Sequence, residues 1–199
     1  RKMKDKEFVE RWAKLPEMIK KSFIEKFWLK EDYLADYVNV DEVNDYRRSN
    51  MIVACALDYS MLSEEQMMDV MGVVRQHLLT PHGLRSLSPE DSRFESTYKQ
   101  NPHEQEAASK NGAVWVWPLM FYFECAFALQ GEKFLAKAKD MYEAYDDNIQ
   151  TYCIGSVAEY YDANPPFAPR GAFSMAWSVG SLLYIQQLIE KQEAKASRA

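Results

Sequence analysis

Cysteine, glycine and proline are all scarce in this 199-residue chain, which contains 3, 7 and 8 of them. An odd number of cysteines without CxxC spacing argues against a disulfide framework or a zinc site, so we expect Cys55, Cys125 and Cys153 to be buried, reduced thiols. The shortage of glycine and proline argues against a disordered, low-complexity chain. Together with 47% hydrophobic residues, the composition predicts one globular, mainly helical unit with a large core.

Positive charge is also in deficit, because the net charge of −6 leaves no excess of basic residues for nucleic acid. No hydrophobic run approaches the roughly 18 residues that a membrane helix needs, and no secretory leader is visible at the start. There is no glycine-rich phosphate loop, and His77, His82 and His103 lack metal-ligand spacing, so we expect neither a cofactor nor a metal. The acidic charge and the odd cysteine count suit the cytoplasm, with a periplasmic location as the alternative.

What the chain does have is helical periodicity. Hydrophobic residues recur at helical spacing over 5–28, which predicts an amphipathic helix bent at Pro16. The partial alternation within 33–40 predicts a short hairpin or extended strand. A capping box formed by Ser63 and Gln66 predicts the start of another helix. Further helices are expected at about 49–60, 113–129, 132–147 and 172–192.

Two long stretches without convincing periodicity, 80–112 and 148–171, are expected to be loops. Long loops on some helices and short turns on others predict an all-α fold of helix pairs whose loops gather at one end. We expect one domain over 1–192 and a charged, frayed tail over 193–199. The functional site should lie where the loops converge.

Several residues near these loops have both a structural and a functional interpretation. Glu159 is either an ordinary solvated carboxylate or a catalytic group at an aromatic, polar loop junction. Trp115 and Trp117 suit core packing, or a platform on which a sugar ring stacks. A set of basic and amide residues either staples loops together or binds sugar hydroxyls. The members of this set are Arg48, Asn50, Arg85, Lys110, Asn111 and Arg170.

Five stretches, in the same order and at the same spacing, resemble a known family over most of the chain. They are KSFIEKFWLKEDYLADYVN, RRSNMIVACALDYSMLSEEQ, LLTPHGLRSLSPEDSRF, NGAVWVWPL and CIGSVAEYYDANPPFAPRGAFSMAWSV. The family is that of the glycogen debranching enzymes of the amylo-α-1,6-glucosidase type. Its catalytic domain is an (α/α)6 toroid with a pocket at one end, and the resemblance implies that this chain is the C-terminal portion of that domain, about half of the ring.

The resemblance also implies a reaction, the hydrolysis of an α-1,6-linked glucosyl branch with inversion by two carboxylates. Glu159 stands in the Gly-Ser-x-x-Glu segment that carries the family's general base. The family's general acid is an Asp in an upstream Trp-x-Asp segment, which this sequence lacks. We therefore expect a fragment that is inactive alone and requires the upstream half of the same polypeptide. The expected substrate-binding residues are Arg48, Asn50, Lys110, Asn111, Trp115, Trp117, Arg170 and Trp177, acting on an α-glucan or oligosaccharide.

Some positions depart from the family pattern. Ser109, Lys110, Asn111 and Ala113 stand where the family often has Tyr, His, Gln and Thr, and Met175 stands in place of a Gln. These departures predict a different α-glucoside substrate or reduced activity. The alternatives are a trehalase-like or oligosaccharide glucosidase-like enzyme, and a non-catalytic carbohydrate-binding toroid. Because half a ring would expose apolar helix faces, we also expect the isolated chain to self-associate.

Overall fold

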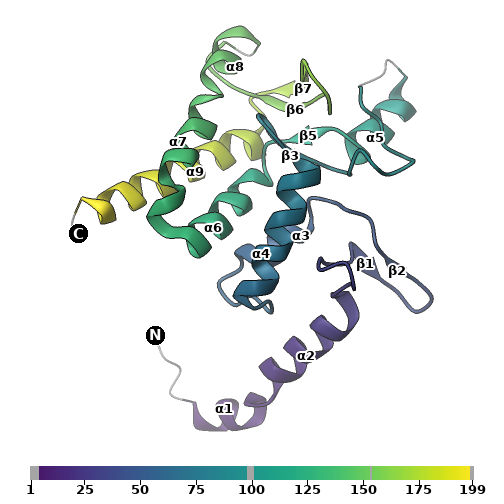
Figure 1. Cartoon of the computed structure of the whole chain (residues 1–199), viewed down its shortest axis with the longest axis vertical. Coiled ribbons are helices and arrows are strands. Elements are labelled where there is room, and N and C mark those ends of the chain that lie inside the picture. The colour runs from purple at the N-terminus through teal and green to yellow at the C-terminus, as the bar shows by residue number, and fades with distance from the viewer. Residues whose placement is uncertain (1–4, 98–100, 153, 198–199) are drawn as a thin grey trace.

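The computed structural model describes residues 5–97, 101–152 and 154–197 (Figure 1). Cys55 and Cys125 are buried, free thiols, as predicted, whereas Cys153 lies outside the described residues. Within the described part of the chain, no helix combines the length and the hydrophobicity needed to span a bilayer.

Three helices pack side by side at the centre of the molecule. They are α3 (Met51–Ala56), α6 (Leu119–Gln130) and α9 (Ala176–Ala196), and α6 contacts both of the others. The helix α4 (Glu64–Val73) packs against α3 and α6, while α7 (Leu135–Glu143) packs against α9 (Figure 1). This packing of neighbouring helices is the α/α arrangement that the sequence predicts.

The central helix α6 is hydrophobic on nearly every side, which is typical of a helix inside a core. Its buried residues are Leu119, Tyr122, Phe123, Cys125, Ala126 and Phe127. Phe123, Phe127 and Phe134 pack edge to face, with ring centroids 5.1 to 6.4 Å apart. Phe134 belongs to a short 3-10 turn, Gly131–Phe134, that joins α6 directly to α7. The short connection implied by the predicted helix ranges 113–129 and 132–147 is therefore a 3-10 turn.

The bend predicted at Pro16 is a complete break between two helices, α1 (Lys6–Trp12) and α2 (Leu15–Phe27). Pro16 lies in the first turn of α2, where a residue without an N–H group breaks no helical hydrogen bond. Neither helix has a fully buried residue, and both extend away from the other helices (Figure 1). Phe23 and Phe27, at the end of α2, pack against the core.

Two local predictions are confirmed. The predicted hairpin is formed by β1 (Tyr37–Val38) and β2 (Val43–Asn44), which pair antiparallel. At the start of α4, Ser63 accepts a hydrogen bond from the Gln66 backbone, and the Gln66 side chain accepts one from the Ser63 backbone.

After α4 the chain continues through a π-helical turn over Val74–Leu78.

The expectation of two long loops is wrong, because these stretches contribute to a five-stranded antiparallel sheet whose strands follow chain order. The strands are β3 (Leu79–Thr80), β4 (Gly83–Arg85), β5 (Val114–Trp115), β6 (Ala158–Tyr161) and β7 (Pro169–Phe173). Strands of two to five residues are too short to show an alternating pattern in the sequence. The stretch 80–112 also contains a helix, α5 (Pro102–Lys110).

The helix predicted to begin at residue 113 begins at Leu119, because Val114 and Trp115 pair with β4 and β6. At the other end of the chain, α9 continues to Ala196, so residues 193–196 of the predicted tail are helical. The predicted helix over 132–147 is divided among the 3-10 turn, α7 and a short helix, α8 (Asp146–Thr151). The sheet lies across one end of the central helices (Figure 1).

Candidate active site

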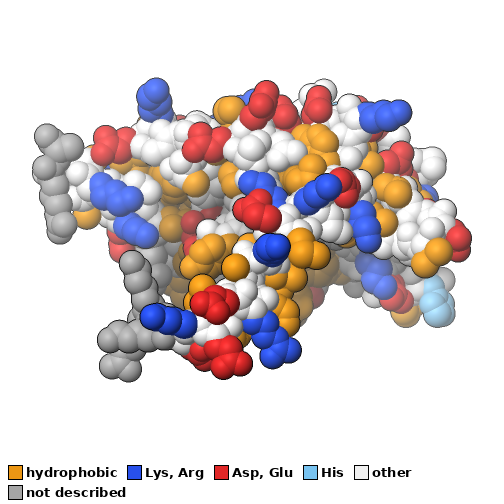
Figure 2. All heavy atoms as spheres, turned by 90° about the horizontal axis from the view of Figure 1, so that it is seen from below, with side chains coloured by type: hydrophobic (Ala, Val, Ile, Leu, Met, Phe, Trp, Pro, Cys, Tyr) orange, Lys and Arg blue, Asp and Glu red, His pale blue; other side chains and the backbone are white. Residues whose placement is uncertain are grey.

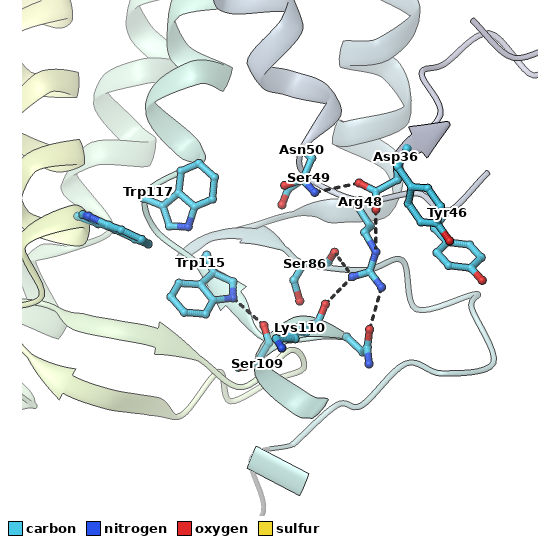
Figure 3. A pocket seen from close by; sticks show the side chains of 13 residues that line it. Asp36, Tyr46, Arg48, Ser49, Asn50, Ser86, Ser109, Lys110, Trp115 and Trp117 are labelled. Carbon is cyan, nitrogen blue, oxygen red and sulfur yellow. Dashed lines mark hydrogen bonds and ion pairs between the residues drawn. The ribbon is translucent and has the colours of Figure 1, made fainter. Parts of the chain in front are cut away.

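A cavity of about 480 Å³ opens beside the sheet, where the chain leaves β1 and β2, α5 ends and α9 begins. Aromatic, hydroxyl, amide and charged side chains share its wall (Figure 3). The lining residues are Asp36, Tyr37, Tyr46, Arg48, Ser49, Asn50, Ser86, Ser109, Lys110, Asn111, Trp115, Trp117 and Trp177. Such a mixture of flat aromatic faces and hydrogen-bonding groups is suited to a polyhydroxylated ligand.

Arg48 organises one side of the cavity. Its guanidinium donates hydrogen bonds to the carbonyls of Ser86 and Lys110, at 3.3 and 2.5 Å, and to the Asn111 side-chain oxygen at 2.8 Å (Figure 3). Its Nε lies 3.4 Å from the carboxylate of Asp36. Most of the guanidinium is therefore engaged by the protein, so the structural interpretation of Arg48 as a loop staple is the one that its contacts support.

Asp36 links Arg48 to the start of α3. The side-chain amide of Asn50 donates a hydrogen bond to the Asp36 carboxylate at 2.9 Å. Asn50 is exposed and lines the cavity (Figure 3). Asp36 thus holds one cation and one amide donor in place at the mouth of the cavity.

Three tryptophans supply the aromatic wall. The indole N–H of Trp115 donates to the Ser109 carbonyl at 2.8 Å, and its ring packs on Tyr160 with centroids 4.9 Å apart. Trp117 and Trp177 meet edge to face at 6.4 Å. The Trp177 residue is 64% exposed, which leaves a large aromatic face open to a ligand.

Lys110 adds a second cation to the wall. Its ammonium lies 2.5 Å from a carboxylate oxygen of Glu106, one turn earlier on α5, and lowers the pKa of Glu106 below its ordinary value. Both side chains are well exposed, so this ion pair contributes little stability. A ligand carbonyl or hydroxyl can therefore approach Lys110 at low energetic cost.

Glu159 lies in β6, half-buried, and is not among the residues that line the cavity. Its Oε2 accepts a hydrogen bond from the Ala172 backbone N–H at 2.9 Å, and its carbonyl accepts one from the Ser178 hydroxyl at 3.0 Å. The next residue, Tyr160, packs on Trp115, and Ser178 follows Trp177 in the chain. Two cavity tryptophans are therefore connected to the backbone around Glu159, Trp115 through the Tyr160 ring and Trp177 through its neighbour Ser178.

Arg170 does not line the cavity either. Its guanidinium pairs with the buried carboxylate of Asp162 at 2.7 Å, across the β6–β7 hairpin. This ion pair raises the pKa of Arg170 above its ordinary value. Arg85 likewise donates to the Ala163 carbonyl at 2.9 Å. Both arginines hold backbone segments together. Their contacts therefore support loop stapling, the structural interpretation given to the basic and amide residues from the sequence.

The structure thus brings seven of the eight predicted binding residues to one cavity, whereas Arg170 and the predicted catalytic residue Glu159 do not line it. Sequence reasoning missed Asp36, Tyr37, Tyr46, Ser49 and Ser86. Tyr37 and Asp36 belong to the predicted hairpin, but nothing in their spacing indicates that this hairpin reaches the cavity. Of the positions that depart from the family pattern, Ser109, Lys110 and Asn111 line the cavity, whereas Ala113 and Met175 do not.

No group of three or more His, Cys, Asp or Glu side chains within 5–97, 101–152 and 154–197 is arranged to hold a metal ion. The groups that line the cavity are a carboxylate, amides, hydroxyls, cations and aromatic rings.

Helix pairs with an aromatic and polar cavity at one end define the class of the α/α-toroid glycoside hydrolases. Within this class the chain belongs to the amylo-alpha-1,6-glucosidase family, whose model matches residues 1–184. The resemblance stated from the sequence is thereby confirmed. No curated protein matches the chain.

The fold is similar to that of the neutral trehalase Nth1 from Saccharomyces cerevisiae, with a TM-score of 0.64 at 13% sequence identity. The match covers 89% of this chain and 30% of the trehalase chain. At this identity the similarity shows the fold alone, and it supports the predicted α/α-toroid arrangement of the helices. The chain spans less than a third of the length of that structure.

Proposed function

We propose that this chain is the base-carrying part of an inverting glycoside hydrolase that removes α-1,6-linked glucosyl branches. Membership of the amylo-alpha-1,6-glucosidase family over residues 1–184 is the observation that carries the proposal. The cavity supports it, because three indoles and several hydrogen-bonding groups form a wall of the kind that binds sugar rings. The substrate class is an α-glucan or a related oligosaccharide.

In this proposal Glu159 is the general base. Its Oε2 is held by the Ala172 N–H, whereas Oε1 takes part in no hydrogen bond with the described residues. A carboxylate with one oxygen anchored and the other available can orient a water molecule and accept its proton as the water attacks the anomeric carbon. The attack on the face opposite the leaving oxygen inverts the configuration, so an α-linkage yields β-glucose.

The general acid is proposed to come from polypeptide outside these 199 residues. An inverting mechanism needs a second carboxyl group roughly 6.5–9.5 Å from the base, leaving room for the water. This sequence has no Trp-x-Asp segment of the kind that carries the family's general acid, and the matched region is only 30% of the similar trehalase chain. The isolated chain should therefore bind sugar weakly and hydrolyse nothing.

A substrate panel with the complete polypeptide tests this function. We expect glucose release from an α-1,6-branched dextrin, with the β-anomer appearing first in ¹H NMR, and no comparable release from trehalose. Preferential hydrolysis of trehalose would favour the trehalase-like alternative. Binding of dextrin without release of glucose would favour a non-catalytic carbohydrate-binding toroid.

A further inference from the structure

Strand β7 crosses close to the carboxylate of Glu159, and one residue makes this approach possible. Gly171 has a positive φ of +77°, a conformation that side chains rarely adopt. A Cβ placed there would lie 2.5 Å from Glu159 Oε2, 2.8 Å from Glu159 Cβ and 2.9 Å from the Tyr160 ring. The carboxylate can swing aside, but Glu159 Cβ can move only with the backbone of β6, and the Tyr160 ring is packed on Trp115.

Ala172, the residue after Gly171, makes a hydrogen bond that depends on the close approach of β7 to Glu159. The backbone N–H of Ala172 donates a hydrogen bond to Glu159 Oε2 at 2.9 Å, across the β6–β7 hairpin. The pairing of these strands shifts register between Ala158 and Tyr160, so the irregularity falls at Glu159 itself. A local break in the ladder is the usual way in which a sheet re-aims one side chain. The N–H group is thus directed at the carboxylate.

The close approach of β7 also involves Tyr160, which connects Gly171 to the cavity wall. The Tyr160 ring, which a Cβ at Gly171 would strike, packs on Trp115 at 4.9 Å, and Trp115 lines the cavity. The Ser178 hydroxyl, in the first turn of α9, holds the Glu159 carbonyl. Glu159 is therefore fixed at its backbone by α9 and at its carboxylate by β7.

We propose that Gly171 and the Ala172 N–H are the positioning device for Glu159, setting the direction of its second oxygen relative to the aromatic wall. The inference rests on the proposed function of Glu159 as general base. Gly171 acts through Glu159 and does not itself touch the substrate. A displacement of about 1 Å at a catalytic group costs up to about 100-fold in rate, so the device has a measurable consequence.

The first test uses the 199-residue chain and needs no activity. In a pH titration followed by ¹H–¹⁵N NMR, the Ala172 amide resonance should follow the ionisation of the Glu159 carboxyl. In Glu159→Gln this titration should disappear, because no ionisable partner remains. An Ala172 resonance with the same pH dependence in both proteins would overturn the proposed contact.

The second test measures kinetics in the complete polypeptide. Gly171→Ala should lower kcat about 10- to 100-fold with KM changed less than about twofold, since the group that moves is the base. The control is Gly131→Ala, which also places a side chain at positive φ (+54°) but in open space, at the end of α6. Gly131→Ala should also be strained by its positive φ, but it should leave kcat unchanged.

Equal kcat values for the two alanine variants would overturn the positioning role. Full activity in Glu159→Gln would contradict a different claim, the role of Glu159 as general base. The pH dependence of the Ala172 resonance tests the hydrogen bond separately, so the two failures can be told apart. If Gly171→Ala does not fold, the titration in the unaltered chain still decides the contact.

Discussion

His82 is enclosed by aromatic side chains under the sheet. Its ring stacks on Tyr161 at 4.8 Å and meets Tyr145 and Phe167 edge to face at 6.1 and 5.6 Å. The Asn148 side chain lies 3.2 Å from its Nδ1. Burial lowers the pKa of His82 below its ordinary value of about 6.5, because a charged imidazolium would lose its hydration there. Phe167 belongs to the β6–β7 hairpin, so this cluster supports the strand pair that carries Glu159.

The sign of the resulting pH dependence follows from proton uptake. Between the lowered folded pKa and the unfolded value, the unfolded chain binds more protons, so the stabilising contribution of neutral His82 is complete above about pH 6.5 and falls as pH decreases. His82→Phe should remove this part of the pH dependence. Urea unfolding at pH 5 and pH 7.5 would measure it, and an identical change in both proteins would contradict the assignment.

Arg48 is the second residue with a definite prediction. Arg48→Lys keeps the charge but loses the fork that reaches the Ser86 and Lys110 carbonyls and the Asn111 side chain. We expect a loss of about 2 kcal/mol in the free energy of unfolding, measured by urea denaturation. The control, Arg75→Lys at an exposed position, should change it by less than about 0.5 kcal/mol. An equal effect of both changes would contradict the role of Arg48 as a staple.

At the scale of elements, the capping box that begins α4 is the best-defined local signal. Ser63→Ala removes the side chain that accepts the Gln66 N–H, and should cost about 1 kcal/mol of stability. Thermal unfolding would detect this as a lower Tm, with Ser92→Ala in an exposed loop as the control. Matching Tm values in the two variants would show that the cap contributes nothing.

Helices could be predicted because their signals are long or chemically marked, as in the Ser63 cap and the periodic stretch that ends at Phe27. The sheet could not, because each strand is short, down to two residues, and most pair with residues distant in sequence. Val114 and Trp115 look like the start of an apolar helix until their partners in β4 and β6 are known. Tertiary pairing thus overrides local preference at the cavity wall.

The candidate site was predictable where a residue type had a clear chemical use. The tryptophans and the loop-end amides line the cavity, and their role in binding a sugar stays a prediction. The roles of Arg48 and Arg170 were not predictable, because a guanidinium can equally well hold loops together or bind sugar hydroxyls. Only the partners, Asp36 for Arg48 and Asp162 for Arg170, show that these side chains hold the protein together.

At the scale of the molecule, an apolar groove runs between α6 and α9. It comprises two adjoining cavities of about 510 and 520 Å³ that share Met120 and Gly180. Tyr184 lines it and donates to Glu124, which raises the pKa of Tyr184 to about 12. Hydrophobic side chains are also exposed among charged ones on the face shown in Figure 2. Surfaces of this kind are normally covered by protein.

We expect the isolated chain to self-associate through this groove, which the rest of the polypeptide is proposed to cover in the complete protein. Gly180→Glu places a charge in the groove and should shift the chain towards monomer. Nothing lies within 4 Å of the position that its Cβ would take. The control, Gly72→Glu, adds the same charge on α4, also in open space. Light scattering would report the mass, and a monomer in the unaltered chain would contradict the expectation.

The most direct measurement of the central claim is the kcat of Glu159→Gln in the complete polypeptide, on an α-1,6-branched dextrin. We predict a loss of about 100- to 10,000-fold with dextrin binding nearly unchanged, because the amide keeps the shape of the side chain but cannot accept the proton of water. Glu143→Gln, an exposed carboxylate on α7, should keep full activity. If Glu159→Gln retained the kcat of the unaltered enzyme, Glu159 would not be the general base.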